Sequence, residues 1–314
     1  MTEPLNPTSS LAERPLRFVI IGAGLSGIMS AIELARAGYR DVTVYEKADR
    51  VGGTWRENTY PGVACDVPSH LYCYSFEPNP DFSQMFSPGH EILAYIESVA
   101  ARHEVIARVR FHEEVTRCEY VQGGWELETS RGRRDRADVL IAASGVTHHP
   151  RIPELPGLAS FAGQAFHSAR WDHAAITRGK RVGIVGTGST AVQLVAALVD
   201  EAETLSLFQR TAQWVMPQDN QRYSPEQRAE FREQPHKLHA LRNFLARRFA
   251  ENFSNAVVDV SSPALKQIEE SSRAHLESAV RDPVLREKLR PDYRAACKRL
   301  IISSEFYPAI QRPN

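Results

Sequence analysis

The apolar residues of this chain first follow the pattern of a buried strand and an amphipathic helix. Residues 17–21, RFVII, form an apolar run that predicts a strand, and apolar positions recur at helical spacing over residues 25–36. A glycine turn separates the two segments, and residues 42–47, VTVYEK, predict the next strand. The start of the chain is therefore predicted to form a βαβ unit.

The same order of elements returns in residues 181–210. The segment RVGIVGTGSTAVQLVAALV predicts a strand, a glycine turn and a helix, and TLSLFQR predicts the strand that follows. Two units of this kind predict an α/β fold with two Rossmann-like dinucleotide-binding domains.

Beyond residue 218 the apolar positions follow a helical period. Ser224 and Gln227 have the spacing of a capping box, with Pro225 at the first helical turn. One helical face is then marked by Leu238, Leu241, Leu245 and Phe249. Residues 263–300 continue as helix, with interruptions at positions 283 and 291. We expect a helical insertion in the second nucleotide domain, with its basic stretch ARRF favoured as a solvated face over a docking site.

The first glycine turn has the residues that a dinucleotide requires. Gly22 permits a tight turn, Gly24 lets the backbone approach a pyrophosphate, and Gly27 lets helix and strand pack closely. Ser26 lies in the same turn. The phosphates would lie at the helix N-terminus, where amides and the helix dipole favour negative charge. Glu46 ends the second strand, where a carboxylate can accept hydrogen bonds from a ribose diol.

The second turn differs from the first in the charge at the end of its second strand. Glu46 lies 24 positions after Gly22, and Arg210 lies 24 positions after Gly186. A carboxylate suits a free ribose 2′-hydroxyl, whereas a guanidinium suits a 2′-phosphate. We therefore expect NADPH at the second turn, with Thr211 as a further hydroxyl contact. The turn itself comprises Gly186, Thr187, Gly188, Ser189, Thr190 and Ala191.

Composition narrows the class of protein. The 314 residues contain 38 Lys and Arg against 38 Asp and Glu, so net charge gives no reason to expect a nucleic-acid partner. The sequence has no stretch of about 18 apolar residues, so integral membrane association is not expected. The four cysteines include no CxxC pair, which disfavours a flavin disulfide reductase and favours a reducing cytoplasm. No metal is expected.

Two nucleotide sites imply electron transfer between two cofactors, and a flavin is the natural partner of a nicotinamide. The segment VGGTWRENTYPGVACDVPSHLYCYSF resembles flavin-dependent monooxygenases that carry a GGTW turn after the FAD-binding strand and a CD motif near the isoalloxazine. The resemblance runs from about residue 17 to the end of the chain. It implies FAD contacts at Gly52, Gly53, Thr54, Trp55, Cys65, Asp66, Tyr72 and Val115.

The connector FAGQAFHSARWD narrows the resemblance. It is similar, at every specified position, to the fingerprint F-x-G-x-x-x-H-x-x-x-W-[P/D] of type I Baeyer–Villiger monooxygenases, through Phe161, Gly163, His167, Trp171 and Asp172. Related enzymes that oxidise nitrogen or sulfur usually carry Tyr or Phe in place of Trp171. Aromatic residues supply much buried area, so we expect the connector to pack on both nucleotide domains. The resemblance implies that His167 couples domains rather than reacts.

The resemblance implies an activity and two further site residues. NADPH would reduce FAD, O2 would give a C4a-peroxyflavin, and attack on a small-molecule ketone would give an ester or lactone. An arginine in the segment YPAIQRPN, here Arg312, would stabilise the negative charge, and Asp66 would orient it. Read from spacing alone, Arg312 is a surface residue and Asp66 a helix cap, because no spacing brings positions 66 and 312 together.

The expected domains follow from these motifs. Residues 1–16 are expected to be a disordered tail and 17–148 the N-terminal part of an FAD-binding domain. Residues 149–218 would hold the fingerprint linker and the NADPH-binding domain, and 219–314 an incomplete helical region of that domain. Members of the family continue beyond the QRPN segment, so we expect a truncated chain. Two alternatives stay open: a heteroatom-oxidising flavin monooxygenase, and an inactive dinucleotide-binding fragment.

Overall fold

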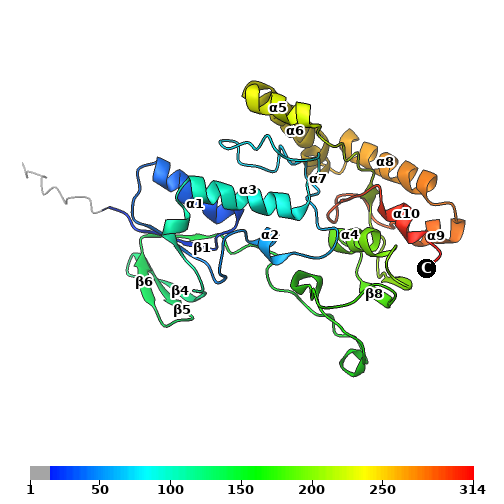
Figure 1. Cartoon of the computed structure of the whole chain (residues 1–314), viewed down its shortest axis with the longest axis horizontal. Helices are drawn as coiled ribbons and strands as arrows, with labels where there is room; N and C mark the ends of the chain where they lie inside the picture. Colours follow the sequence, from blue (N-terminus) through cyan, green and yellow to red (C-terminus); the bar gives the residue numbers. More distant parts are fainter. Residues whose placement is uncertain (1–14) are drawn as a thin grey trace, which may run out of the picture. The chain divides into compact units, whose positions relative to one another are not determined.

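The computed structural model describes residues 15–314, which divide into two compact units (Figure 1). Unit 1 contains the chain up to Thr54 together with Ile96–His148, and unit 2 contains Trp55–Tyr95 and His149–Asn314. Most of the expected tail, residues 1–14, lies outside the described residues. Residues 55–95, which the sequence analysis placed with the FAD-binding domain, group with unit 2.

Unit 1 is built on a parallel sheet that contains the first predicted βαβ unit. Strand β1 (Phe18–Ile21) lies between β2 (Val42–Tyr45) and β7 (Val139–Ala142), and β3 (Val109–Arg110) pairs with β2. Helix α1 (Leu25–Arg36) connects β1 to β2. The apolar residues of β1 and β2 are buried on both faces, as parallel strands require. The predicted βαβ unit is confirmed.

A second sheet in unit 1 is antiparallel. It comprises β4 (Val115–Val121), β5 (Gly124–Thr129) and β6 (Arg134–Ala137), in that order. Asp135 of β6 connects this sheet to the parallel one, because its carboxylate accepts a hydrogen bond of 2.7 Å from the Tyr45 hydroxyl and pairs with Arg17 at 2.6 Å. Burial alone raises the Asp135 pKa, but the hydrogen bonds from Arg17, Tyr45 and the Arg136 amide outweigh it and lower the pKa.

Two helices and three 3-10 turns lie along the chain between β2 and the second βαβ unit. Helix α2 (Thr54–Glu57) lies where the chain passes from unit 1 to unit 2, and α3 (Gly89–Arg102) where it returns. The 3-10 turn η1 (Ile106–Arg108) leads into β3. In the connector, η2 (Leu158–Ser160) and η3 (Ser168–Arg170) precede the strands of the second βαβ unit.

Unit 2 contains the second predicted βαβ unit. Strands β8 (Arg181–Val185) and β9 (Thr204–Phe208) pair in parallel, and α4 (Ser189–Leu198) connects them. The buried face of α4 forms one core cluster with apolar residues of the C-terminal helix α10 (Phe306–Ile310), which lies beside it (Figure 1). This prediction is also confirmed, and the overall α/β class with it.

The helical region follows β10 (Val215–Met216), which pairs with β11 (Ile301–Ile302). Helix α5 (Pro225–Glu233) begins with the predicted capping box. The Ser224 hydroxyl accepts from the Gln227 backbone amide, and the Gln227 side chain accepts from the Ser224 backbone amide. The remaining helices are α6 (Pro235–Phe249), the π-helical turn η4 (Ala250–Ser254), α7 (Asn255–Val258), α8 (Pro263–Ala279) and α9 (Pro283–Lys288).

One sequence expectation for this region is wrong. Helix was expected over residues 263–300, but helix α9 ends at Lys288 and residues 289–300 are irregular. Pro291 lacks an amide hydrogen and disfavours helical geometry in the residue before it, so the chain leaves the helix there.

Within residues 15–314, no helix is long and apolar enough to cross a membrane.

Candidate functional site

The first glycine turn is shaped by close approaches that only glycine allows. Gly22 has φ +99°, and a Cβ there would lie 2.5 Å from the carbonyl oxygen of Ala143. At Gly27 a Cβ would lie 1.9 Å from the Gly22 carbonyl oxygen, so α1 is packed directly onto the turn. Both glycines are therefore required by the fold itself. Ser26, the remaining predicted residue of the turn, is exposed.

Gly24 differs from these two glycines because it has room for a methyl group. A Cβ on Gly24 would meet its nearest atom, the Cα of Gly53, at 3.5 Å, an ordinary contact. The reverse does not hold, since Gly53 has φ +52° and its Cβ would approach the Gly24 Cα to 2.9 Å. Gly24 is also the N-cap of α1 and has no side chain to cap it. The N-cap of α1 thus supplies no side-chain acceptor to the amides of the first turn.

Glu46 follows β2 and is buried beside this turn. One carboxylate oxygen accepts from the Ala23 amide at 2.9 Å, and the other accepts from the Ala48 amide at 2.9 Å. These two bonds fix the orientation of the Glu46 carboxylate beside the turn. Val115, the first residue of β4, packs partly buried against the core cluster of Val19 and Tyr45.

The second glycine turn is more open than the first. Gly186 has φ +116°, and a Cβ at either Gly186 or Gly188 would meet no atom of residues 15–314 within 4 Å, apart from its chain neighbours. The hydroxyl of Thr187 donates to the Thr211 carbonyl at 3.0 Å and accepts from the Gln213 side-chain amide at 3.3 Å. Arg210 follows β9 and is exposed. The turn is thus open at the Cβ positions of its two glycines, and the hydrogen bonds of the Thr187 hydroxyl hold the residue between them.

Asp66 lies beside Ser189, the first residue of α4, and is paired with an arginine that was not predicted from the sequence. Its carboxylate forms an ion pair with the guanidinium of Arg299 and accepts from the Ser189 hydroxyl at 3.3 Å. Arg312 instead pairs with Asp200 at 2.7 Å. The expected orientation of Arg312 by Asp66 is therefore corrected: the arginine beside Asp66 is Arg299.

Hydrophobic periodicity could not have identified Arg299. It stands in the irregular segment after α9, where neither helical nor strand periodicity applies, and it is 233 positions from Asp66. A local signal is the pair of basic residues Lys298 and Arg299, which comes one residue before β11. Its side chain is 64% exposed, which leaves the charge accessible.

Trp55 and Tyr72, both expected at the flavin, are in contact with each other. The Trp55 indole donates to the Tyr72 hydroxyl at 3.3 Å, and the rings meet edge to face with centroids 5.7 Å apart. Burial raises the Tyr72 pKa, so the hydroxyl remains protonated. Burial also raises the Cys65 pKa to about 12, which excludes a thiolate there at neutral pH. Thr54 begins α2 and is exposed.

Helix α4 is anchored to the segment that carries Asp66. The Tyr60 hydroxyl donates to the Gln193 side-chain oxygen at 2.8 Å, and the Gln193 amide donates to the Ala64 carbonyl at 3.1 Å. The Tyr60 hydroxyl also contacts the side chain of Thr190. A Cβ on Gly62 would lie 2.9 Å from the Gln193 carbonyl oxygen, so chain and helix are in close contact. These bonds fix the position of Asp66 relative to the second turn.

The connector's aromatic residues divide into packed and exposed groups. Trp171 packs against the core cluster of unit 2 and meets Phe166 edge to face at 5.2 Å. Phe161 is 61% exposed and Phe166 36%. The ring of Phe161 lies over Gly163 and is largely exposed. The Nδ1 atom of His167 accepts from the Ala169 amide at 3.1 Å, which caps η3.

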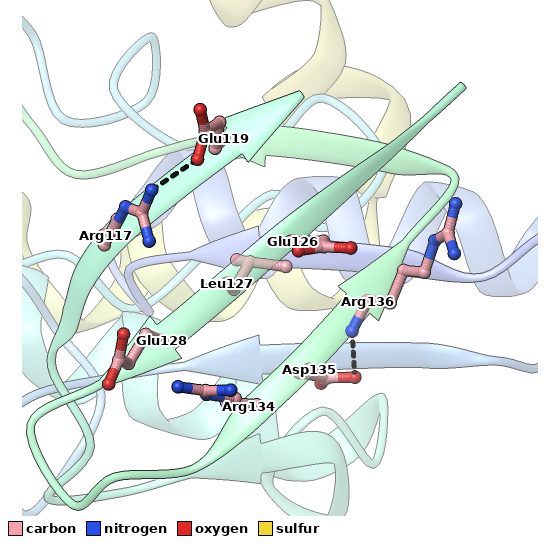
Figure 2. Close-up of a pocket in the computed structure, with 8 residues that line it drawn as sticks. All are labelled: Arg117, Glu119, Glu126, Leu127, Glu128, Arg134, Asp135 and Arg136. Carbon is pink, nitrogen blue, oxygen red and sulfur yellow. Dashed lines mark hydrogen bonds and ion pairs between the residues drawn. The ribbon is translucent and has the colours of Figure 1, made fainter. Parts of the chain in front are cut away.

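A shallow pocket on the antiparallel sheet of unit 1 contains none of the predicted site residues (Figure 2). Arginines alternate with acidic residues over β4 to β6, and Arg117 pairs with Glu119 at 2.5 Å. The lining comprises Arg117, Glu119, Glu126, Leu127, Glu128, Arg134, Asp135 and Arg136. Because these charges neutralise one another on an open surface, we assign the pocket no role in the site.

Both turns satisfy the requirements of a dinucleotide cradle. Each follows a parallel strand, and each leads into a helix whose N-cap is a glycine, Gly24 or Gly188. In the first βαβ unit, the second strand is followed by the Glu46 carboxylate. In the second unit, it is followed by the exposed Arg210. The residues present therefore fit FAD at the first turn and NADPH at the second.

The sequence profile of the flavin-binding monooxygenase-like family matches residues 16–262, so the chain belongs to this family. A Baeyer–Villiger monooxygenase of Streptomyces coelicolor is 41% identical over 95% of this chain and 57% of the relative. An uncharacterized monooxygenase of Mycobacterium tuberculosis is 48% identical over 93% of this chain and 59% of the relative. The chain thus spans less than two thirds of the length of these relatives.

Solved structures share the fold. The open crystal structure of cyclohexanone monooxygenase superposes with a TM-score of 0.81 at 30% identity, covering 95% of this chain and 66% of that chain. An oxidized steroid monooxygenase bound to NADP gives a TM-score of 0.81 at 30% identity, over 95% and 64% of the two chains.

Proposed function

We propose that this protein acts as a Baeyer–Villiger monooxygenase, which uses NADPH, FAD and O2 to insert one oxygen atom next to a ketone carbonyl and gives an ester or lactone. The observation that carries the proposal is the Asp66–Arg299 ion pair at the start of α4, because the reaction needs a fixed cation beside the nicotinamide site. The fingerprint of residues 161–172 and the named Baeyer–Villiger relatives support this subclass within the family.

We assign the first turn to FAD and the second to NADPH. Glu46 would accept the ribose hydroxyls of FAD, and Gly24 would let the pyrophosphate approach the first amides of α1. Arg210 would bind the 2′-phosphate of NADPH. FAD, when bound and reduced, would supply the electrons that activate O2.

Arg299 takes the role that the sequence resemblance suggested for Arg312. Its guanidinium can stabilise an oxyanion that develops on the substrate. The Asp66 carboxylate holds the guanidinium in place, and the Ser189 hydroxyl in turn holds Asp66. Trp171 and His167 belong to the connector and, on this proposal, position it rather than touch the substrate.

Anaerobic mixing of the FAD-loaded protein with NADPH, followed by air and either cyclohexanone or thioanisole, tests the proposal. We expect NADPH to bleach the flavin absorbance and the ketone to yield a lactone. Sulfoxide without lactone would favour a heteroatom-oxidising enzyme. Failure of NADPH to reduce bound flavin would contradict both activities and leave a nucleotide-binding fragment.

Replacing Gly24 with alanine should weaken FAD binding without disturbing the fold. The methyl group has room in the protein, 3.5 Å from Gly53, but would intrude where the pyrophosphate approaches. Overpacking costs about 1–3 kcal/mol, so we expect roughly 5- to 150-fold weaker FAD binding in a fluorescence titration.

The contrasting variant is Gly27→Ala. Its methyl group would lie 1.9 Å from the Gly22 carbonyl oxygen, so the midpoint of thermal unfolding should fall even without FAD. Parent-like FAD affinity in the folded Gly24→Ala protein would remove the first turn from the FAD site.

A further inference from the structure

A chain of hydrogen bonds leads from the second glycine turn to Tyr293, a residue outside both nucleotide motifs. The Tyr293 hydroxyl donates to the Gln213 side-chain oxygen at 2.8 Å. The Gln213 amide donates to the Thr187 hydroxyl at 3.3 Å, and that hydroxyl donates to the Thr211 carbonyl at 3.0 Å. Each polar atom in this chain has a donor or acceptor role that is complementary to its neighbour's, so the arrangement is fully specified.

The backbone of Tyr293 is itself fixed. The indole nitrogen of Trp214 donates to the Tyr293 carbonyl at 2.8 Å, and Trp214 belongs to a buried core cluster with Leu265 and Leu300. Burial raises the Tyr293 pKa, so its hydroxyl remains a donor at neutral pH. Tyr293 is therefore held through both its hydroxyl and its carbonyl.

The same tyrosine contacts the segment that carries the candidate cation. The ammonium of Lys298 lies 4.3 Å from the centre of the Tyr293 ring, a cation–π distance, and Arg299 follows Lys298. Arg299 pairs with Asp66, which accepts from Ser189 at the other end of the glycine turn. Tyr293 is thus connected to the turn in two ways. One passes through Gln213 to Thr187, and the other through Lys298, Arg299 and Asp66 to Ser189.

The glycines of the turn allow its backbone more than one conformation, so side-chain contacts help to select one. Gly186 and Gly188 flank Thr187, and glycine has the largest backbone freedom of any residue. Apart from the chain neighbours, no described residue places an atom within 4 Å of a Cβ position on either glycine, so side-chain packing does not cover the turn there. Backbone hydrogen bonds hold the two ends of the turn, from the Gly186 amide to the Phe208 carbonyl at 3.0 Å and from the Val192 amide to the Gly188 carbonyl at 3.1 Å. Between these ends, the Thr187 hydroxyl is held by Gln213, and Gln213 is held by Tyr293.

We propose that Tyr293 is a positioning residue, which acts through Gln213 and Thr187 to hold the second glycine turn in the conformation that receives NADPH. The inference rests on the proposed function and adds a residue to it. It assigns Tyr293 no contact with coenzyme or substrate. Loss of its hydroxyl should raise the entropy cost of binding, because the coenzyme must then order the turn itself.

Calorimetric titration of the purified protein with NADP⁺ tests this without measuring activity. For Tyr293→Phe we expect roughly three- to tenfold weaker binding, the effect of one lost hydrogen bond. Gln213→Met removes the same chain at its middle and should have a similar effect. The double variant should bind no more weakly than either single variant, since all three lose one chain of bonds.

The matched control is Tyr120→Phe, an exposed tyrosine on the antiparallel sheet of unit 1, which should bind NADP⁺ like the parent. A merely structural role for Tyr293 would lower the unfolding midpoint and FAD affinity together, and would overturn the inference. Parent-like NADP⁺ binding by Tyr293→Phe, or additive losses in the double variant, would overturn it alone. Absence of NADP⁺ binding by the parent would instead overturn the proposed function, and this inference with it.

Discussion

Arg299→Ala is expected to reduce lactone formation by about a hundredfold or more, the usual cost of removing one preorganised charge from a site that stabilises an oxyanion. NADPH should still be consumed, because Arg299 belongs to neither glycine turn. Reduced flavin should then react with O2 and release hydrogen peroxide. Product analysis by gas chromatography, alongside a peroxide assay, measures both effects.

Arg312→Ala is the matched control for this prediction. Both arginines are more than half exposed and both pair with an aspartate, but Arg312 pairs with Asp200 rather than Asp66. We expect Arg312→Ala to form lactone at nearly the parent rate, and Arg299→Lys to recover part of it because the charge is retained. If Arg312→Ala loses activity and Arg299→Ala does not, the cation has been wrongly assigned.

Arg210→Ala should weaken NADP⁺ binding by roughly 10- to 150-fold, since a charge-assisted hydrogen bond contributes about 1.5–3 kcal/mol. NAD⁺ lacks the 2′-phosphate, so its affinity should change little. Separate calorimetric titrations with the two coenzymes measure the difference. The loss for NADP⁺ should also shrink as salt is added, because the contact is between an exposed charge and a phosphate.

Arg178→Ala provides the control for Arg210. Arg178 is an exposed arginine of the same unit that pairs with Glu201 at 2.9 Å, so its removal changes net charge equally without touching the end of β9. Equal losses of NADP⁺ affinity in the two variants would mean that general electrostatics, and not a phosphate contact, explains the effect. Equal losses for NADP⁺ and NAD⁺ would likewise remove Arg210 from the site.

Local pattern was sufficient for both βαβ units and for the start of α5. In each case the information lies within about 30 consecutive residues: an apolar strand, glycines at fixed offsets, a helical period, and a charged residue 24 positions on. Backbone geometry and capping act over the same short range, so Gly22, Gly27 and Ser224 could be interpreted before any contact was known.

The partner of Asp66 was decided only by the tertiary structure. Two arginines, Arg299 and Arg312, were available in the C-terminal segment, and the sequence resemblance favoured the wrong one as the partner of Asp66. The contact joins residues 233 positions apart and depends on how α4 packs on the chain around Asp66. Charge pairing carries no periodic signal, so only the folded chain identifies which arginine is brought to the carboxylate.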